Sequence, residues 1–551
     1  MKMHALAAAL GLALATTAQA LPTEKSSLSM EVIGQYQTGV FDDGAAEIVA
    51  HDALNQRIFV INAGAATVDV LDINDPENPQ KIGEIDVTSL GDGVNSVAVN
   101  KHIVAVAIES DPRQDPGKVA LFDATDLSYI NHVEVGALPD MVTFTPDGRY
   151  VLVANEGEPD DDYLVDPEGS VSIIDLRYGP MHASVRTADF SEYDGMEDTL
   201  RAQGIRIFGP GASASQDLEP EYITVARNSR HAWVSLQEAN ALAVIDIRKA
   251  KITDILPLGT KDHSLPGNKL DASNEDGPTN DGVINITNWP VQGMYLPDAI
   301  ASYSYRGKTY VVTANEGDSR DYDGYSEEVR VKDIVLDPVV FPNAAELQQD
   351  ENLGRLKTTI ANGDIDGDGE HEVIYGYGAR SFSIWTGNGE LVYDSGADFE
   401  NITANQLPDD FNSTNDENGS FDDRSDDKGP EPEGIALGKI GGRTIAFIGL
   451  ERVGGIMAYD ISNPNEVQFL DYINYRNFSV DATIDDPNST DPDDVLTNPL
   501  VGDLAPEGLV FIRASKSPNG KPLLVVGNEV SGTTTIFEID VETPRKGEFR
   551  H

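Results

Sequence analysis

The chain has 551 residues, of which 93 are Asp or Glu and 39 are Lys or Arg, so its formal net charge is −54. A surface with this charge repels nucleic acids and anionic membranes, which excludes both as general partners. The chain has no cysteine, which excludes disulfides and zinc sites built on thiolates.

The first 20 residues have the pattern of a secretory signal peptide. Lys2 precedes an apolar run from Ala5 to Ala15, and Ala18-Gln19-Ala20 forms a small-residue cleavage site. The alternative is a retained membrane anchor, but a spanning helix needs about 20 apolar residues and this run is shorter. We therefore predict a secreted or periplasmic protein that loses residues 1–20 and has no membrane span.

From residue 47 onward one short pattern recurs: an acidic turn, an apolar strand, a turn, and a second strand that ends at a glutamate. The seven first strands begin as AAEIVAH, GVNSVAV, LPDMVTF, EPEYITV, LPDAIAS, EPEGIAL and APEGLVF. A third strand usually follows, as in TVDVLDI, and several copies add a fourth. Repeats of four short strands are typical of propeller blades. We predict an all-β fold, one seven-bladed β-propeller of the YVTN or WD40 kind over residues 21–551.

The two ends of the chain are predicted to close the ring. The last copy lacks a fourth strand, and an unpaired strand, MEVIGQY from Met30 to Tyr36, precedes the first copy. Pairing the two would remove exposed sheet edges. We therefore expect the N-terminal strand to complete the last blade.

Long segments rich in Asp, Asn, Gly, Pro and Ser interrupt the later repeats, and we predict loops there rather than a second core. One stretch, Asn412 to Glu433, is polar enough to be mobile until it binds something. Such loops would form a rim around one mouth of the channel, where function is often carried. The insertions cover about 177–218, 259–295, 317–378, 396–431 and 473–505.

The recurring acids are expected to meet at one mouth. In a blade the first strand lines the channel and the second runs antiparallel to it, so the start of one and the end of the other lie together. The first-strand acids are Glu47, Asp140, Glu221, Asp298, Glu433 and Glu507, with Asn95 in the remaining copy. The second-strand acids are Glu109, Glu156, Glu238, Glu316, Glu451 and Glu529, with Ala63 in the remaining copy.

Carboxylates crowded into one channel raise one another's pKa unless a cation neutralises them. Oxygen ligands without thiolate or histidine favour calcium, or else magnesium or manganese. The alternative for each acid is a structural hydrogen bond to a turn. The preferred metal ligands, whose motifs agree best between copies, are Asp140, Glu156, Asp298, Glu316, Glu433, Glu451, Glu507 and Glu529.

A second calcium site is predicted in the insertion of the fifth repeat, at DIDGDGEHE. Its expected ligands are Asp364, Asp366, Asp368 and Glu372. The spacing resembles calcium loops of the EF-hand and integrin type, although Tyr375 stands where an EF-hand has its closing glutamate. The alternative is a solvated acidic turn.

Other chemistry has little support in the sequence. No glycine-rich phosphate loop, GxSxG or HExxH motif occurs in it. Arg320 and Arg452 follow two of the recurring glutamates and could bind an anionic substrate or pair with surplus acids, and we favour pairing.

Several long motifs resemble the choice-of-anchor I family of exported bacterial proteins, which are often described as alkaline phosphatase-like and are related to mesenchyme-specific cell-surface glycoproteins. The motifs are ANEGEPDDD, LPGNKLDASNEDG, WPVQGMYLPDAIASY, ANEGDSRDYDGY, GYGARSFSIW and GPEPEGIALGKIGGRTIAFIGLERVGGIMAYDI. The resemblance implies a propeller but fixes no catalytic residue, and this sequence shows no C-terminal anchor pattern. By analogy of fold, propeller phosphatases and lactonases hold calcium or iron at such a mouth.

These observations lead to three functional hypotheses. The first is a secreted calcium-binding propeller that hydrolyses a small anionic phosphate ester, with the metal polarising a phosphoryl oxygen and a spare carboxylate acting as base. The second is a non-catalytic surface protein that binds an extracellular polymer, and the third is a lactonase. We expect a monomer in each case.

Overall fold

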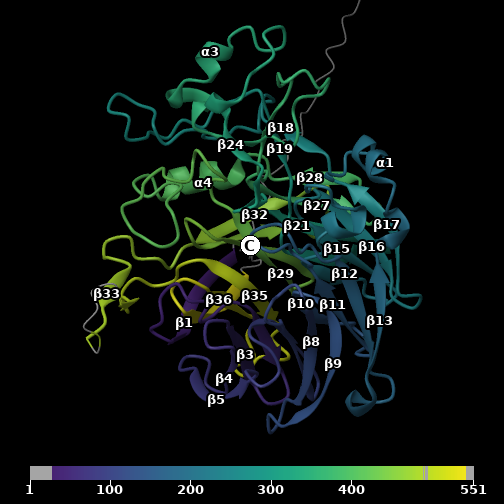
Figure 1. Cartoon of the computed structure of the whole chain (residues 1–551). Coiled ribbons are helices and arrows are strands. Elements are labelled where there is room, and N and C mark those ends of the chain that lie inside the picture. The colour runs from purple at the N-terminus through teal and green to yellow at the C-terminus, as the bar shows by residue number, and fades with distance from the viewer. Residues whose placement is uncertain (1–27, 488, 490–493, 542–551) are drawn as a thin grey trace, which may run out of the picture.

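Seven four-stranded antiparallel sheets make up most of the computed structural model, which describes residues 28–487, 489 and 494–541 (Figure 1). The predicted signal peptide lies outside the described residues. The first six sheets each use strands in chain order. They are β2 (Val49–Asp52), β3 (Arg57–Asn62), β4 (Thr67–Asp72) and β5 (Gln80–Asp86); β6 (Val94–Asn100), β7 (Ile103–Ile108), β8 (Pro116–Asp123) and β9 (Tyr129–Ala137); β10 (Pro139–Phe144), β11 (Tyr150–Asn155), β12 (Ser170–Asp175) and β13 (Ser184–Asp189); β14 (Ile223–Val225), β15 (His231–Leu236), β16 (Ala241–Asp246) and β17 (Lys251–Pro257); β20 (Ile300–Tyr305), β21 (Lys308–Asn315), β27 (Ser381–Thr386) and β28 (Leu391–Asp394); β29 (Pro432–Ile440), β30 (Arg443–Leu450), β31 (Ile456–Asp460) and β32 (Gln468–Ile473).

The seventh sheet joins the two ends of the chain. It contains β35 (Pro506–Ile512), β36 (Leu523–Asn528) and β37 (Thr533–Val541), and its outer strand is β1 (Leu28–Gln37), which pairs antiparallel with β37. The first strands of successive sheets contact one another, and β35 contacts β2. The ring is therefore closed, and the predictions of a β-propeller and of an N-terminal strand that completes the last sheet are confirmed.

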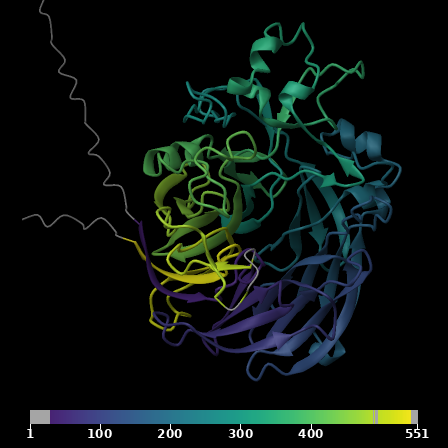
Figure 2. The same ribbon diagram turned by 60° about the vertical axis from the view of Figure 1, so that its left-hand side comes forward.

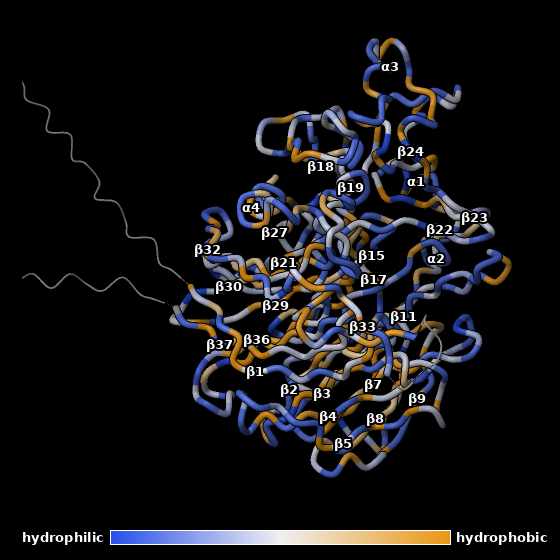
Figure 3. The backbone as a smooth tube through the Cα atoms, turned by 90° about the vertical axis from the view of Figure 1, so that its left-hand side faces the viewer, coloured by the Kyte–Doolittle hydropathy of each residue, from blue (hydrophilic) through white to orange (hydrophobic). Residues whose placement is uncertain are grey.

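The middle strands of the sheets are buried on both faces. β11 (YVLVAN) and β36 (LLVVGN) are buried throughout, whereas the outer strand β5 is mostly exposed. Each sheet packs face to face between its two neighbours, so its middle strands are covered on both faces while its outer strand stays partly exposed. Figure 3 shows the hydrophobic segments along the sheets and hydrophilic ones at their ends.

All five insertions leave the ring at the same face, because each follows a second or a fourth strand. The first begins later than predicted, since β13 is the fourth strand of the third sheet; η2 (Ser191–Tyr193), α1 (Glu197–Ala202) and α2 (Ala214–Asp217) then follow. The fourth contains α4 (Asp398–Gln406), and the fifth contains β33 (Thr483–Asp485) and β34 (Val495–Thr497). The predicted rim is thus made by structured segments.

Two insertions build a small core of their own, so the prediction of loops without a second core was wrong. β18 (Thr260–Asp262), β19 (Val291–Met294) and β26 (Ile374–Gly376) form one sheet, and β24 (Glu328–Arg330) pairs with β25 (Lys357–Thr359). With α3 (Ala344–Leu347) they stand above the ring in Figures 1 and 2. The apolar residues are spread too thinly for periodicity to reveal them; they include Val291, Val331, Leu336, Leu353, Leu356 and Ile374.

No helix within the described ranges combines the length and the apolar character that crossing a membrane requires.

Candidate metal centre

A cavity of about 330 Å³ lies at the channel mouth and is lined mainly by carboxylates. The described residues that line it include no Lys, Arg or His. The acids on its wall are Asp140, Glu156, Glu158, Glu221, Glu238, Asp298, Glu316, Asp318, Glu433 and Glu507.

Strand pairing brings the two recurrent acidic positions to one end of each sheet. In the sixth sheet Pro432, directly before Glu433, pairs with Leu450, directly before Glu451. The same relation holds between Pro139 and Asn155 and between Pro506 and Asn528. The expected convergence of first-strand and second-strand acids is therefore observed.

The glycine that follows the acid in the EPEG motif permits close packing between first strands. A Cβ atom at Gly434 would lie 1.9 Å from the carbonyl oxygen of Glu507 in the next sheet. Any larger residue would push the sixth and seventh sheets apart. The motif thus sets the spacing of neighbouring carboxylates around the cavity.

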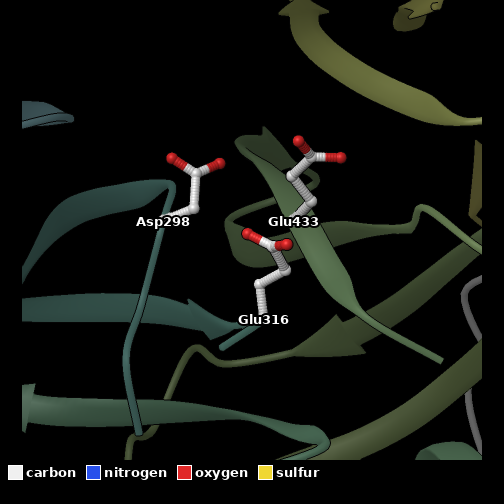
Figure 4. A group of neighbouring side chains, drawn as sticks. All are labelled: Asp298, Glu316 and Glu433. Carbon is white, nitrogen blue, oxygen red and sulfur yellow. The ribbon is translucent and has the colours of Figure 1, made fainter. Parts of the chain in front are cut away.

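Three acids on this wall converge most closely. Asp298, Glu316 and Glu433 each offer one carboxylate oxygen, and these oxygens all lie within 4.8 Å of one another. Figure 4 shows the three side chains directed toward a common space. This separation is suited to shared ligation of one hard cation.

Several oxygens on the cavity wall have no hydrogen-bond partner among the described residues. Oε2 of Glu221 and Oε2 of Glu238 are examples, and each residue is only 7% exposed. Oε2 of Glu433 and Oε2 of Glu507 are also buried and unpartnered. A buried carboxylate oxygen without a partner must be stabilised by a proton or a cation.

Burial and mutual repulsion raise the pKa values of these acids. Burial, followed by the charges of Glu158 and Glu109, raises the pKa of Asp140 to about 7. The pKa of Glu238 is raised to about 7, again mainly by burial. The pKa values of Glu156, Glu221, Asp298, Glu433 and Glu507 are raised well above the ordinary range for the same reasons.

A neighbouring carboxylate group is neutralised by bases instead. Glu316, Glu431 and Glu451 also offer oxygens within 4.8 Å of one another. Glu431 receives Arg424 at 2.7 Å, Lys428 at 3.1 Å and Arg452 at 3.1 Å. Burial opposes ionisation of Glu431, but Lys428, Arg424 and Arg452 outweigh it and lower its pKa to about 2. This group is an ion-pair network.

Six of the eight preferred ligands line the cavity, and two do not. Glu451 belongs to the ion-pair network, and Glu529 is not on the wall of the cavity. Sequence reasoning missed Glu158 and Asp318, although each lies two residues beyond a recurrent glutamate in the similar motifs ANEGEP and ANEGDS. It also missed Glu431, which has no counterpart at most other repeats.

The predicted loop site is only partly assembled. Asp364, Asp366 and Glu372 offer oxygens within 4.8 Å of one another, while Asp368 is outside this group. The carboxylate of Asp364 accepts hydrogen bonds from the backbone N–H groups of Gly367 (2.7 Å) and Gly369 (2.9 Å). These bonds also fit a solvated acidic turn, so the calcium site stays a prediction.

The two arginines near the recurrent glutamates pair with surplus acids, as favoured. Arg320 is buried and pairs with Asp217 and with Glu219, the latter at 2.7 Å. Arg452 pairs with Glu431 and Glu451. Neither arginine lines the cavity.

The motifs on this wall belong to a known family. The model of the choice-of-anchor I domain matches residues 47–464, which is most of the ring and its insertions. The chain belongs to the choice-of-anchor I domain family. The resemblance stated from the sequence is thereby confirmed.

Two curated relatives of this choice-of-anchor I protein are animal proteins. "Gigasin-3a" of Magallana gigas is 32% identical over 35% of the chain and 66% of its own length. The "Mesenchyme-specific cell surface glycoprotein" of Strongylocentrotus purpuratus is 29% identical over 49% of the chain and 38% of its own length. The chain thus spans less than two thirds of either relative.

Among solved structures, Kuenenia stuttgartiensis hydrazine synthase aligns with 93% of the choice-of-anchor I chain and 100% of its own, at 12% identity and a TM-score of 0.44.

Proposed function

We propose that this protein is an extracellular propeller that binds a hard divalent cation, with Ca²⁺ the expected ion, at Asp298, Glu316 and Glu433. The observation that carries the proposal is the convergence of these three carboxylates within 4.8 Å of one another, beside wall oxygens of Glu221, Glu238, Glu433 and Glu507 that have no hydrogen-bond partner among the described residues. Glu316 is also engaged by Lys428 at 3.1 Å and by Gln237 at 3.0 Å, so the ion would share this carboxylate with them. All donors are oxygens, and Ca²⁺ takes about 6 to 8 oxygen ligands. Neighbouring wall acids and water would complete the coordination.

The role we propose for the loaded centre is binding without turnover. A cation at the mouth would convert a repulsive acidic cavity into a site for an anionic group of an extracellular polymer. The rim of insertions would supply further contacts. The animal relative described as a cell surface glycoprotein supports an extracellular setting.

Ester hydrolysis is the second candidate, and the cavity itself favours it. About 330 Å³ beside the three converging acids leaves room for a small ester. Asp140 and Glu238, with pKa values raised to about 7, are suited to exchange protons near neutral pH. A metal-dependent phosphoesterase or a lactonase would use the bound ion to polarise the scissile group.

Metal analysis of purified protein tests the proposal. The double variant Asp298→Asn/Glu433→Gln should lose one bound Ca²⁺ per chain, while Glu77→Gln, an exposed acid of the first sheet, should keep the wild-type content. Equal calcium content in the wild type and the double variant would refute the centre. Phosphomonoester, phosphodiester and lactone assays, with and without chelator, then separate binding from hydrolysis.

A further inference from the structure

A second group of buried acids lies between two insertions, and none of its members lines the channel cavity. Asp271 and Asp276 come from the insertion between β17 and β20, and Glu400 and Asp422 come from the insertion between β28 and β29. All four are buried among the described residues. Sequence reasoning assigned no role to any of them.

Within the part of the chain that the structure describes, Arg380 is the base that pairs with an acid of this group, and it is already engaged. Arg380 donates from Nη1 to Oε1 of Glu400 at 2.5 Å. Its remaining hydrogen bonds go to the backbone carbonyls of Asp271 (2.6 Å), Ser425 (2.8 Å) and Asp427 (2.8 Å). Arg380 therefore neutralises Glu400 and makes no hydrogen bond to the carboxylate of Asp271 or of Asp422.

Asn412 lies beside these acids, since its Nδ2 donates to Oε1 of Glu400. Among the described residues, three oxygens here have no hydrogen-bond partner: Oδ1 of Asp271, Oδ1 of Asn412 and Oδ2 of Asp422. Asp271 is 1% exposed, and Asn412 and Asp422 are 0% exposed. The second oxygen of Asp271 accepts from the N–H of Asn285, and that of Asp422 accepts from Oγ of Ser425, both at 2.5 Å. In each of these two carboxylates, one oxygen accepts a hydrogen bond and the other has no partner among the described residues.

Hydrogen bonds hold these three residues in one network. Nδ2 of Asn412 donates to Oγ of Ser425 at 2.9 Å and to Oε1 of Glu400 at 3.3 Å. Ser425 in turn donates to Asp422, and Oε2 of Glu400 accepts from the N–H of Asp271 at 3.1 Å. The unpartnered oxygens therefore belong to neighbouring side chains.

A glycine turn of the first insertion packs over the bare oxygen of Asp422. Gly282 has a φ of +80°, and a Cβ atom there would lie 2.5 Å from Oδ2 of Asp422. Asp276 holds this turn by accepting from the N–H of Val283 at 2.8 Å. A side chain at position 282 would therefore collide with Oδ2 of Asp422, so the glycine leaves this oxygen uncovered by any side chain of its own.

We propose that Asp271, Asn412 and Asp422 bind a hard divalent cation, with Ca²⁺ the expected ion, in the seam between these two insertions. Only oxygens are offered, which favours calcium over transition metals. Oδ1 of Asp271 and Oδ2 of Asp422 are buried without a hydrogen-bond partner among the described residues, and Arg380 is engaged with Glu400, so a cation is the counter-charge that these carboxylates lack. The ion ties two parts of the rim together, and its ligands are separate from those of the channel centre.

Calcium content and calcium-dependent stability test this site separately from the channel. Asp422→Asn should bind one Ca²⁺ fewer per chain than the wild type and should show a smaller rise in melting temperature on calcium addition. Asp298→Asn/Glu433→Gln should retain the ion in the seam. Asp409→Asn, an exposed acid of the same insertion, is the matched control.

Two results would overturn the proposal. If Asp422→Asn keeps the wild-type calcium content and calcium response, Asp422 carries a proton instead, which asparagine mimics. If Asp422→Asn does not fold, Asp271→Asn and the channel double variant decide the question. A folded channel variant that binds no calcium would refute the seam site directly.

Discussion

Two glutamates of one motif, Glu431 and Glu433, show how strongly local environment decides the state of a side chain. Lys428, Arg424 and Arg452 overcome the effect of burial and lower the pKa of Glu431 to about 2. Burial, followed by the charges of Glu451 and Glu507, raises the pKa of Glu433 well above the ordinary range. The sequence EPEG gives no sign of this difference, because the three bases reach Glu431 only in the folded chain.

Lys428 is the residue whose loss tests this balance. It pairs with Glu316 and Glu431, both at 3.1 Å, so Lys428→Met removes the base that pairs with Glu316 and leaves Glu431 with Arg424 and Arg452 only. We expect the metal-free protein to lose about 3 kcal/mol of unfolding free energy. Urea unfolding in chelator measures this loss.

Calcium should restore part of the stability of Lys428→Met, since Glu316 is shared by the ion-pair network and the proposed centre. Lys521→Met removes a lysine that pairs with Glu538 and Asp540 at the surface, and it should leave the unfolding midpoint unchanged. An unfolding midpoint of Lys428→Met equal to that of the wild type in chelator would contradict the role given to Lys428.

At the scale of elements, closure of the ring depends on pairing between the two ends of the chain. β1 pairs with β37 from Leu28↔Val541 to Gln37↔Thr533, with a register shift between Val32 and Gly34. Met30 packs into a core with Phe447 and Leu524, so the strand also covers apolar surface. The unpaired strand before the first repeat was a sufficient signal for this closure, because an open sheet edge is unfavourable.

Removing β1 should therefore open the seventh sheet. A chain that begins at residue 38 is expected to unfold at a lower temperature and to self-associate through the free edge of β37. Scanning calorimetry and size-exclusion chromatography measure the two effects, with a chain that begins at residue 28 as control. Identical melting and elution of the two chains would show that β1 does not stabilise the ring.

At the scale of the whole molecule, the acids that the fold gathers at the channel mouth are expected to make the stability of the protein depend on pH. Burial, followed by neighbouring acids, raises the pKa of Glu47 to about 8 and that of Asp140 to about 7. A folded-state pKa above the unfolded value means that the folded chain holds the proton more tightly. The resulting stability is complete below about pH 4 and is lost as the pH rises through 7 to 8.

The chelated protein should consequently melt at a lower temperature at pH 9 than at pH 5. A net loss of about 4 kcal/mol corresponds to a fall of about 4 °C in a chain of this size. Calcium should raise the melting temperature more at pH 8 than at pH 5, since protons compete with the ion for carboxylates. A chelated melting temperature that rises across this window would contradict the prediction.

The order of strands, the closure of the ring and the meeting of recurrent acids at one mouth were determined by the sequence alone. Each follows from local periodicity and from strand direction, which repeats make easy to recognise. Asp140, Glu156, Asp298, Glu316, Glu433 and Glu507 were located in this way. Only the tertiary structure decides which acids are paired with a base, as Glu431 is, and which have an oxygen without a partner, as Glu433 does.

The insertions do not follow the repeat pattern, so the positions of their charged side chains depend on contacts between segments that are distant in sequence. Arg424 and Lys428 reach Glu431 because the polar stretch before it is folded and buried, contrary to the mobility considered from its composition. Asp271 and Asp422 are 151 residues apart in sequence, and hydrogen bonds through Glu400, Asn412 and Ser425 join them in one network. Electrostatic energy depends on distances in space and on exclusion of water, and neither is encoded in the spacing of residues along the chain.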